Sequence, residues 1–481
     1  MRQSLSRFAG HQWRTTSLVA PFLVAALVLT GCADQLPVGE SRAEVVESGD
    51  LPDAMLNVEG GIDLAVLDDV GSFDASVANA YFELSYNTTK TELLTPPVAS
   101  RNFGYTGVAL YEALVGGMPG YQSMVGQLNE FDSAPSIDPA LEYHWPTVAN
   151  SALGRIMWGL YKDRPAALAS IRALHDEYAK EFRSVLSQET YQRSALHGRA
   201  VAKAVQQWSK TDGYKQYNAC AYTPPVGKGL WIPTPPNYAP ALQPCWGMLR
   251  TSATPDGSYS DPGPPPEYSE VPGTPFYIEA EEVLNTVANL TQEQLDIALF
   301  WSDDPGTTGT PPGHSISICR QIIEQEGIML DGAAEAYARV GLAVHDAFIN
   351  CWWSKYEHNL LRPVTYIRNL WDPDWLPPLG TPPFPEYTSG HSVQSGAAFQ
   401  VMTDMWGDIP FTDHTHDARG LAPRSFNTFF EAAEEAAISR LYGGIHYRAA
   451  IDLGVTQGML VGSAVSALDW HSVASVVATT R

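Results

Sequence analysis

Prolines are concentrated in one stretch of this 481-residue chain, and that stretch restricts what the chain can fold into. Residues 222–277 contain 14 of the 36 prolines. Proline has no backbone N–H to donate, so it is excluded from helix interiors and from central strands. We therefore predict a long ordered loop or insertion here, and long loops of this kind often cover functional sites.

The regions on either side of this loop have helical periodicity. Apolar residues recur at i, i+3 and i+4 from Ala75 to about Tyr214, and a similar pattern resumes at Tyr277 and continues to about Val473. Apolar residues make up 44% of the chain and charged residues 17%, which is typical of a globular protein. We predict an all-α fold of packed helix bundles, with residues 71–475 forming a single helical domain.

The charge balance excludes one broad class of partner. The chain has 29 Lys and Arg against 53 Asp and Glu, a formal net charge of −24. A polyanion such as nucleic acid would be repelled at long range, so we expect no nucleic-acid binding. A few clustered cations could still bind a small anion.

The N-terminus has the pattern of an export signal. Three arginines precede an apolar run at 18–29, which is too short to span a bilayer. The run ends in Leu29-Thr30-Gly31-Cys32, which resembles the bacterial lipobox, in which the cysteine becomes the lipid-modified first residue. We expect a lipoprotein signal at 1–31, an acidic flexible tether at 32–70, and an exported cell-envelope protein that contacts the membrane only through its lipid. An ordinary signal peptide with an incidental cysteine is the alternative.

The other four cysteines divide into two pairs. Cys220 and Cys245 flank part of the Pro-rich segment, and we predict a disulfide between them in an oxidising compartment. Cys319 and Cys351 lie in apolar helical patterns and are predicted to be buried thiols. No C-x-x-C or H-E-x-x-H spacing indicates a zinc site. The segment Asp413-His414-Thr415-His416-Asp417 resembles a metal cluster, but it lies in a predicted loop and is interpreted as solvated polar residues.

Three short segments within residues 350–455 carry candidate functional groups. In the first, Lys355 and Arg362 are seven positions apart, about two helical turns, so both cations can lie on one face of a helix. Pro363 predicts that this helix ends at Arg362. By itself, such a pair is typical of a solvated surface.

The second segment is Ser389-Gly390-His391, followed by an apolar helical pattern. A helix start offers free N–H groups and the positive end of its dipole to an oxyanion. Gly390 permits close backbone approach, Ser389 adds a hydroxyl donor, and His391 can exchange a proton near neutral pH. A plain serine N-cap beside a surface histidine would look the same.

The third segment runs from Ser439-Arg440 to His446. Six positions on one helix would direct Arg440 and His446 about 120° apart, at about 100° per residue. Gly443-Gly444 can end the first helix, so that His446 opens the next one and both side chains converge. A helix–turn–helix with a surface arginine and a capping histidine is the alternative.

Together and in this order, Lys-x6-Arg-Pro, Ser-Gly-His and Ser-Arg-x5-His resemble the signature of the superfamily that joins type 2 phosphatidic acid phosphatases with vanadium-dependent haloperoxidases. The chain looks like a bacterial member of the haloperoxidase branch. The resemblance implies a vanadate cofactor whose oxygens are held by the side chains or backbone of Lys355, Arg362, Ser389, Gly390 and Arg440. Phosphate, also a tetrahedral oxyanion, would fit the same site.

The resemblance also implies roles for the two histidines and two aromatic residues. His446 would bond the vanadium, and His391 would handle the proton of bound peroxide or of water. Trp352 and Phe384 look like residues that line the halide pocket in fungal chloroperoxidases, although both could simply be core aromatics. The segment 301–314, with Trp301-Ser302-Asp303-Asp304 and His314, resembles one in bacterial haloperoxidase-like proteins and is given no role.

The sequence departs from the family pattern at two positions. Thr388 stands where the second motif usually begins with proline, which we expect to be tolerated. An aspartate commonly follows the third-motif histidine by four residues, but position 450 is Ala, and Asp452 would point elsewhere on a helix. The partner that orients His446 is therefore left open.

The expected function is oxidation of halide by hydrogen peroxide at a vanadate site, giving a hypohalous-acid-type halogenating species. The alternative is hydrolysis of a phosphate ester at the same site, through a phosphohistidine on His446. A third possibility is a cell-surface protein that keeps the fold without activity. The resemblance also makes a homodimer possible.

Overall fold

The computed structural model describes residues 69–472, and nearly all of its regular structure is helical, as predicted. The predicted signal peptide, and all but the last two residues of the predicted tether, lie outside the described residues. The α-helices are α1 (Ser76–Thr91), α2 (Pro96–Leu114), α3 (Trp145–Leu160), α4 (Pro165–Val185), α5 (Gln188–Ser209), α6 (Tyr214–Tyr217), α7 (Pro275–Ala288), α8 (Gln292–Phe300), α9 (Thr310–Gln325), α10 (Leu330–His358), α11 (Pro363–Leu370), α12 (Gly390–Trp406), α13 (Phe429–Tyr442) and α14 (Arg448–Ser466).

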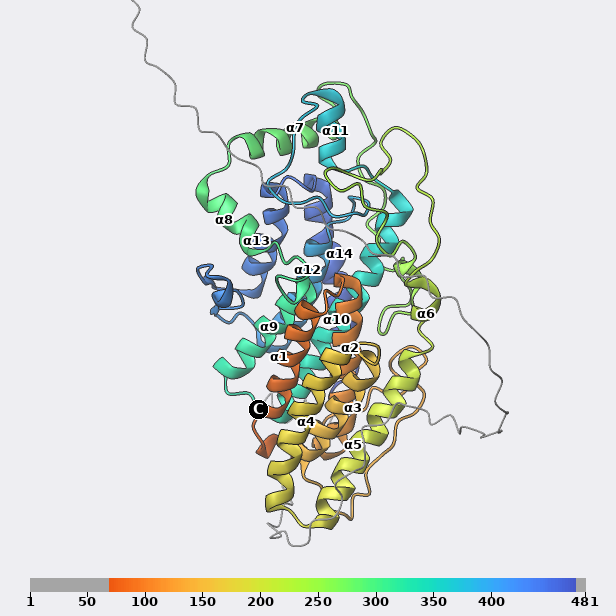
Figure 1. Ribbon diagram of the computed structural model, residues 1–481, viewed down its shortest axis with the longest axis vertical. Coiled ribbons are helices and arrows are strands. Elements are labelled where there is room, and N and C mark those ends of the chain that lie inside the picture. The colour runs from red at the N-terminus through yellow and green to blue at the C-terminus, as the bar shows by residue number, and fades with distance from the viewer. Residues whose placement is uncertain (1–68, 473–481) are drawn as a thin grey trace, which may run out of the picture. The chain divides into compact units, whose positions relative to one another are not determined.

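Helix α10 is the central element of the described fold. Most of its residues between Leu330 and Lys355 are buried, because α2 packs along one side and α12 along another. In Figure 1, α3, α4 and α5 gather near one end of the bundle, and α7, α8 and α11 lie near the opposite end. A helix that is apolar nearly all round is one enclosed by other elements, which is the place α10 has. None of the described helices has both the length and the apolar character needed to cross a bilayer.

Helices α12 and α14 approach each other closely enough to fix the start of α12. A Cβ atom on Gly458 of α14 would lie 2.0 Å from the carbonyl oxygen of Val393 in α12, so this crossing requires glycine. At the N-terminal end of α12, the Ser389 amide donates to the Ala450 carbonyl at 2.9 Å. The contact between these helices therefore anchors the second sequence segment against the third.

The Pro-rich segment is an irregular loop, as predicted, and it packs against α10. The Leu242 carbonyl in this loop accepts hydrogen bonds from Trp352 Nε1 at 3.2 Å and from the Tyr356 hydroxyl at 2.7 Å. The following helix α7 begins at Pro275, slightly earlier than the predicted end of the loop at 277, because proline is favoured in the first turn of a helix.

The predictions about the cysteines are confirmed. Cys220 and Cys245 form a disulfide with a Cα–Cα distance of 6.1 Å. Cys319 and Cys351 are free thiols, and both are buried, in α9 and α10 respectively. The disulfide closes a 25-residue separation within the Pro-rich region and so restricts the loop that carries Leu242.

The prediction that Lys355 and Arg362 share one helix is wrong. Helix α10 ends at His358, where Asn359 adopts a left-handed conformation with φ 47°, and Arg362 is the N-cap of the next helix, α11. The reason is local: the four residues before Pro363 form a non-helical link in which Leu360 pairs with Leu230, and Pro363 begins α11 instead of stopping α10. The two cations nevertheless converge, because both bond to the backbone of the 384–388 segment.

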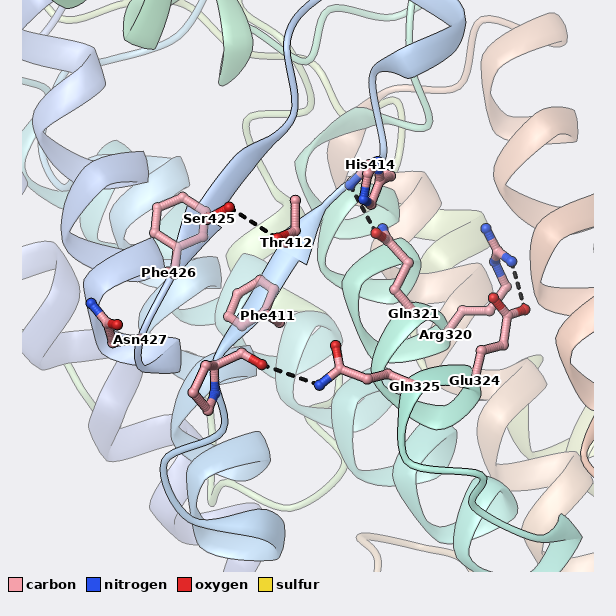
Figure 2. Close-up of a pocket in the computed structure, with 11 residues that line it drawn as sticks. Arg320, Gln321, Glu324, Gln325, Phe411, Thr412, His414, Ser425, Phe426 and Asn427 are labelled. Atoms are coloured by element: carbon pink, nitrogen blue, oxygen red, sulfur yellow. Dashed lines mark hydrogen bonds and ion pairs between the residues drawn. The ribbon is translucent and has the colours of Figure 1, made fainter.

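Two short strands and four 3-10 helices, η1 (Val70–Ser72), η2 (Val115–Gly117), η3 (Trp246–Met248) and η4 (Asp417–Arg419), are the other regular elements of the described residues. Strands β1 (Phe411–Asp413) and β2 (Arg424–Phe426) pair antiparallel, with Phe411 opposite Phe426. They form a hairpin that lies against α9, as seen in the close-up of Figure 2. The hairpin places Asp413 at the end of a strand, next to a helix, instead of in a free loop.

Candidate active site

A cavity of about 380 Å³ opens where the three sequence segments meet. Its wall is formed by the middle of α10, the start of α12, the end of α13, the turn before α14, the 302–305 segment and the 379–384 loop. Both apolar and ionisable side chains line the cavity. The ionisable groups that line it include Asp303, Asp304, His391, Arg440 and His446, and the aromatic ones include Trp352 and Phe384.

Arg362 is fully buried and still has an unused donor. Its Nε donates to the Phe384 carbonyl at 2.9 Å, and Nη1 donates to the Ile445 carbonyl at 2.8 Å. The buried Nη2 has no hydrogen-bond partner. Burial lowers the pKa of Arg362 to about 10, which still leaves the guanidinium charged near neutral pH. A buried charge with an unpaired donor is costly unless an anion binds it.

Arg440 supplies a second buried guanidinium to the same cavity. It is 1% exposed, and its Nε donates to the Ser439 hydroxyl at 2.9 Å. Burial lowers its pKa to about 10, while Asp303 and Asp304 act in the opposite direction. Helix α13 ends at Tyr442 and Gly444 takes the left-handed conformation with φ 70°, so Arg440 and His446 reach one cavity as predicted. His446 lies in the turn before α14, two residues ahead of the predicted position at its start.

Lys355 is placed differently from the other two cations. Its Nζ donates to the backbone carbonyls of Pro385 at 3.1 Å and Glu386 at 3.0 Å, and also to that of Thr388. All three of its protons therefore hold the segment that leads into Ser389, and its charge acts on the cavity through space. Burial lowers the pKa of Lys355 to about 8. Its predicted direct bond to an oxyanion stays a prediction.

His446 is oriented by Glu386, a residue to which the sequence analysis gave no role. The His446 Nδ1 lies 2.8 Å from Glu386 Oε1, which also accepts from the Tyr447 amide at 2.8 Å. Burial is the largest effect that lowers the pKa of His446, followed by the field of Arg362. A neutral imidazole with its proton on Nδ1 has its lone pair on Nε2, which here accepts from Arg362 Nη1 at 3.2 Å. Glu386 thus fills the place that Ala450 left open.

The second segment presents its groups at the start of α12. Ser389 is the N-cap, and its oxygen accepts from the Ser392 amide at 3.3 Å, which leaves the hydroxyl proton free to donate. Gly390 lines the cavity, and a Cβ there would meet nothing closer than a Trp352 ring carbon at 3.8 Å. The His391 ring bonds to the Trp301 carbonyl, and its Nε2 has no partner. Burial and Arg440 lower the pKa of His391, so its ring is neutral near pH 7.

The two aromatic residues predicted for a halide pocket do lie together. The rings of Trp352 and Phe384 are 4.9 Å apart at their centroids, and both line the cavity. Lys355 Nζ lies 5.0 Å from the centre of the Phe384 ring, and the Arg362 guanidinium lies 4.9 Å from it. Leu242 of the Pro-rich loop adds to this wall, so the loop covers the apolar side of the cavity.

These groups fit a small tetrahedral oxyanion. Arg362 Nη2 and His391 Nε2 are buried polar atoms without partners, and Gly390 leaves space at a helix N-terminus. Planar guanidinium groups suit the oxygens of vanadate or phosphate, and the unprotonated Nε2 of His446, beside Arg362 Nη1, suits the central atom. The groups inferred from the sequence therefore lie around one cavity. Lys355 does not line the cavity and lies behind the 384–388 segment that it bonds.

The interpretation of 413–417 as solvated is wrong for two of its residues. Asp413 is 0% exposed and His416 is 1% exposed, whereas His414 and Asp417 are on the surface. Asp413 ends β1 and faces α9, where His314 meets it. This packing could not be predicted from local patterns, because β1 is only three residues long.

Comparisons with known proteins agree on one family. The model of the VCPO second helical-bundle domain matches residues 335–473, which include all three segments. Vanadium chloroperoxidase from Curvularia inaequalis is 26% identical over 258 residues; the match spans 41% of this chain and 42% of the length of that protein.

Solved structures resemble the whole described domain. The crystal structure of a bacterial vanadium-dependent iodoperoxidase has 35% sequence identity and a TM-score of 0.76, and the match covers 83% of this chain and 98% of that one. A holo-type bacterial vanadium-dependent chloroperoxidase has 18% identity and a TM-score of 0.61, over 79% of this chain and 93% of that one, which is a likeness of fold.

Proposed function

Because the chain belongs to the family of vanadium-dependent haloperoxidases, we propose that it uses vanadate and hydrogen peroxide to oxidise halide to a hypohalous-acid-type halogenating species. The observation that carries the proposal is the neutral His446, held by Glu386, beside the buried guanidinium of Arg362. A metal-binding imidazole and a cationic cradle for oxyanion oxygens are the two parts that a vanadate site needs.

Each group of the chain has a proposed task. Arg362, Arg440 and the start of α12 bind and orient the oxyanion, and His446 Nε2 bonds its central atom. Vanadate, when bound, supplies a Lewis-acid centre that activates peroxide toward halide. His391 Nε2, neutral and without a partner, accepts and returns the proton of the incoming peroxide.

We propose iodide as the preferred halide. Support comes from the 35% identity to a bacterial iodoperoxidase along nearly the whole of that chain. The wall around Trp352, Phe384 and Leu242 is apolar, which suits a large and weakly hydrated anion better than a small, strongly hydrated one. Hydrogen peroxide and halide are thus the proposed substrates.

Parallel assays test the proposed function. The purified protein, loaded with vanadate, is given peroxide and iodide, bromide or chloride, and a second sample without vanadate is given a phosphate ester. We expect vanadate-dependent iodide oxidation and negligible ester turnover. No oxidation of any halide together with rapid ester hydrolysis would replace the proposal with the phosphatase alternative.

We propose export and lipid anchoring on the basis of the N-terminal sequence alone, with Cys32 as the modified residue. In a bacterial host, the full chain should partition into detergent and its Cys32→Ser variant into the aqueous phase. Equal partitioning of the two would contradict the anchor.

A homodimer is a further prediction from the family, to be measured as molar mass by light scattering.

A further inference from the structure

A second group of ionisable side chains adjoins the cavity, which one of its members lines, and takes no part in the proposed reaction. Its members are Asp303, His314, Asp413 and His416, each at most 2% exposed. His314 Nδ1 lies 2.9 Å from Asp303 Oδ2, and His314 Nε2 lies 2.6 Å from Asp413 Oδ2. His416 Nε2 lies 3.3 Å from Asp303 Oδ1. Four buried titratable groups in mutual contact require a physical explanation.

Hydrogen bonding within the protein satisfies His314 and Asp413, but not His416 or both oxygens of Asp303. Neither ring nitrogen of His416 has a hydrogen-bond partner, and neither does Asp303 Oδ1, although all three atoms are buried. The ring of His416 packs instead against Phe300, with centroids 4.9 Å apart, and against His314 at 4.6 Å. His416 Nε2 has only the Asp303 carboxylate oxygen at 3.3 Å, and the buried Nδ1 has no hydrogen-bond partner, so the protein does not meet the full bonding capacity of this ring.

We propose that Asp303, His314 and His416 bind a divalent first-row transition-metal cation, and that Asp413 orients His314 from outside the coordination shell. One ligand atom from each of the three residues lies within 4.8 Å of the others. Ligand atoms around a tetrahedral zinc ion lie about 3.3 Å apart, given bonds of about 2.0–2.1 Å. His314 Nδ1 lies 2.9 Å from Asp303 Oδ2, and His416 Nε2 lies 3.3 Å from Asp303 Oδ1, so each imidazole is near that edge length from one oxygen of the same carboxylate.

The position of Asp413 supports a metal at His314. Metal-bound histidines usually donate their other ring N–H to a carboxylate, which fixes the tautomer. Asp413 Oδ2 is that carboxylate for His314 Nε2, and Asp413 Oδ1 is in turn held by the Thr415 amide at 2.9 Å and by Gln321 Nε2 at 3.3 Å. His314 Nδ1 is thereby directed at Asp303 and the centre of the group.

Charge and ligand type select the class of cation. Asp303 and Asp413 bring two carboxylates into a buried region, and a divalent cation bound beside them would offset both negative charges. Two imidazoles and one carboxylate suit zinc and its first-row neighbours, whereas calcium and magnesium prefer oxygen ligands alone. The three ligands come from the 301–306 segment, α9 and the loop after β1, so the cation would join three parts of the fold.

The scaffold that holds this loop is visible around His414 in Figure 2, where the β1–β2 hairpin lies along α9. Gln321 accepts from the His414 amide at 2.8 Å, and Gln325 donates to the Pro410 carbonyl at 3.1 Å. These two bonds fix the backbone on both sides of Asp413. His416 is thus presented by a segment that is already anchored, a favourable arrangement for a metal site.

Zinc binding to the full-length protein tests the proposal. The wild-type protein is stripped with a chelator, titrated with zinc, and assayed for bound metal by elemental analysis and for its Tm. We expect about one equivalent of tightly bound zinc and a raised Tm, with no response to calcium or magnesium. No saturable binding of zinc, nickel, cobalt or manganese to the stripped wild-type protein would overturn the site, whatever the variants do.

A matched pair of variants locates the bound metal. His416→Gln removes a proposed ligand, whereas His414→Gln, two residues away, changes an exposed histidine that bonds Asp417. We expect His414→Gln to bind one equivalent and His416→Gln to lose at least tenfold in affinity while still binding vanadate. Equal zinc affinity in both variants would show that the metal lies elsewhere and overturn the assignment.

Discussion

Two buried carboxylate–imidazole pairs lie in the described domain, and their surroundings have opposite charge. Glu386 holds His446 Nδ1 at 2.8 Å, and Asp413 holds His314 Nε2 at 2.6 Å. Around His446 the additional charged groups are guanidinium and ammonium cations, whereas around His314 the additional charge is the Asp303 carboxylate. The pair at His446 therefore faces an unpaired donor, Nη2 of Arg362. The pair at His314 faces an unpaired acceptor, Oδ1 of Asp303.

This contrast shows that the carboxylate–imidazole pair does not itself determine which ion a site takes. The pair fixes a tautomer and directs one ring nitrogen outward. The neighbouring residues determine which ion binds. The unpaired Nη2 of Arg362 favours an oxyanion, and the unpaired Oδ1 of Asp303 favours a cation. Asp303 belongs to both places, since it also lines the oxyanion cavity.

The largest effect is expected for His446→Ala, which removes the proposed bond to the metal of the oxyanion. Vanadate affinity and halide oxidation should fall by more than the roughly 100-fold that is the upper end for outer-shell residues. Vanadate titration and initial rates measure this, with the zinc content as an internal control that should not change. Retention of activity within tenfold would contradict the role of His446.

Glu386→Ala should produce the next largest loss. Without Oε1, the His446 ring loses its orientation, and vanadate affinity should fall by roughly 10- to 100-fold. Glu386→Gln keeps an oxygen acceptor and should recover part of this loss, while Glu357→Gln, on the exposed side of α10, should behave as wild type. A Glu386→Ala variant with unchanged vanadate affinity would show that the pair has no such role.

Asp413→Asn is the equivalent change in the other pair. We expect zinc affinity to fall by about tenfold, because the neutral amide holds His314 less strongly than a carboxylate does. Vanadate affinity should stay within a factor of two. Asp417→Asn, on the surface of the same loop, is the matched control. Loss of vanadate binding with intact zinc binding would show that Asp413 supports the oxyanion site and not the proposed zinc site.

The smallest effect is expected for Lys355→Gln, and it should depend on pH. Burial lowers the pKa of Lys355 to about 8, so the wild-type ammonium is charged at pH 7 and mostly neutral by pH 9.5. Wild type should bind vanadate on the order of tenfold more tightly than the variant at pH 7, and the ratio should approach one at pH 9.5. Ionisation of vanadate cancels in this ratio. A ratio that does not change with pH would assign Lys355 a purely structural part.

Sequence patterns were sufficient where a local rule determined the geometry. The Gly443-Gly444 break correctly brought Arg440 and His446 together, and the cysteines flanking the Pro-rich segment correctly predicted a disulfide. The all-α class followed from the 3.6-residue period. These features depend on short-range backbone preferences, which a sequence displays directly.

Features that depend on packing between distant segments could not be predicted. Glu386 is 60 positions from His446, and nothing in the local pattern of either residue indicates the pairing. His416 and Asp413 looked like exposed loop residues because only the contact of β1 with α9 buries them. Lys355 bonds to three carbonyls because the 384–388 segment is irregular, a geometry that its spacing from Arg362 does not reveal.

The burial of the two free thiols has a consequence for a protein that would release hypohalous acid. Thiolates are the side chains that such oxidants attack first, and Cys319 and Cys351 lie out of reach inside α9 and α10, while the other two described cysteines are already joined. Among the described residues, the most exposed methionine is Met248, which lies in the Pro-rich loop and is 61% exposed. Damage by the enzyme's own product should begin there, as methionine sulfoxide on a surface residue that the core does not need.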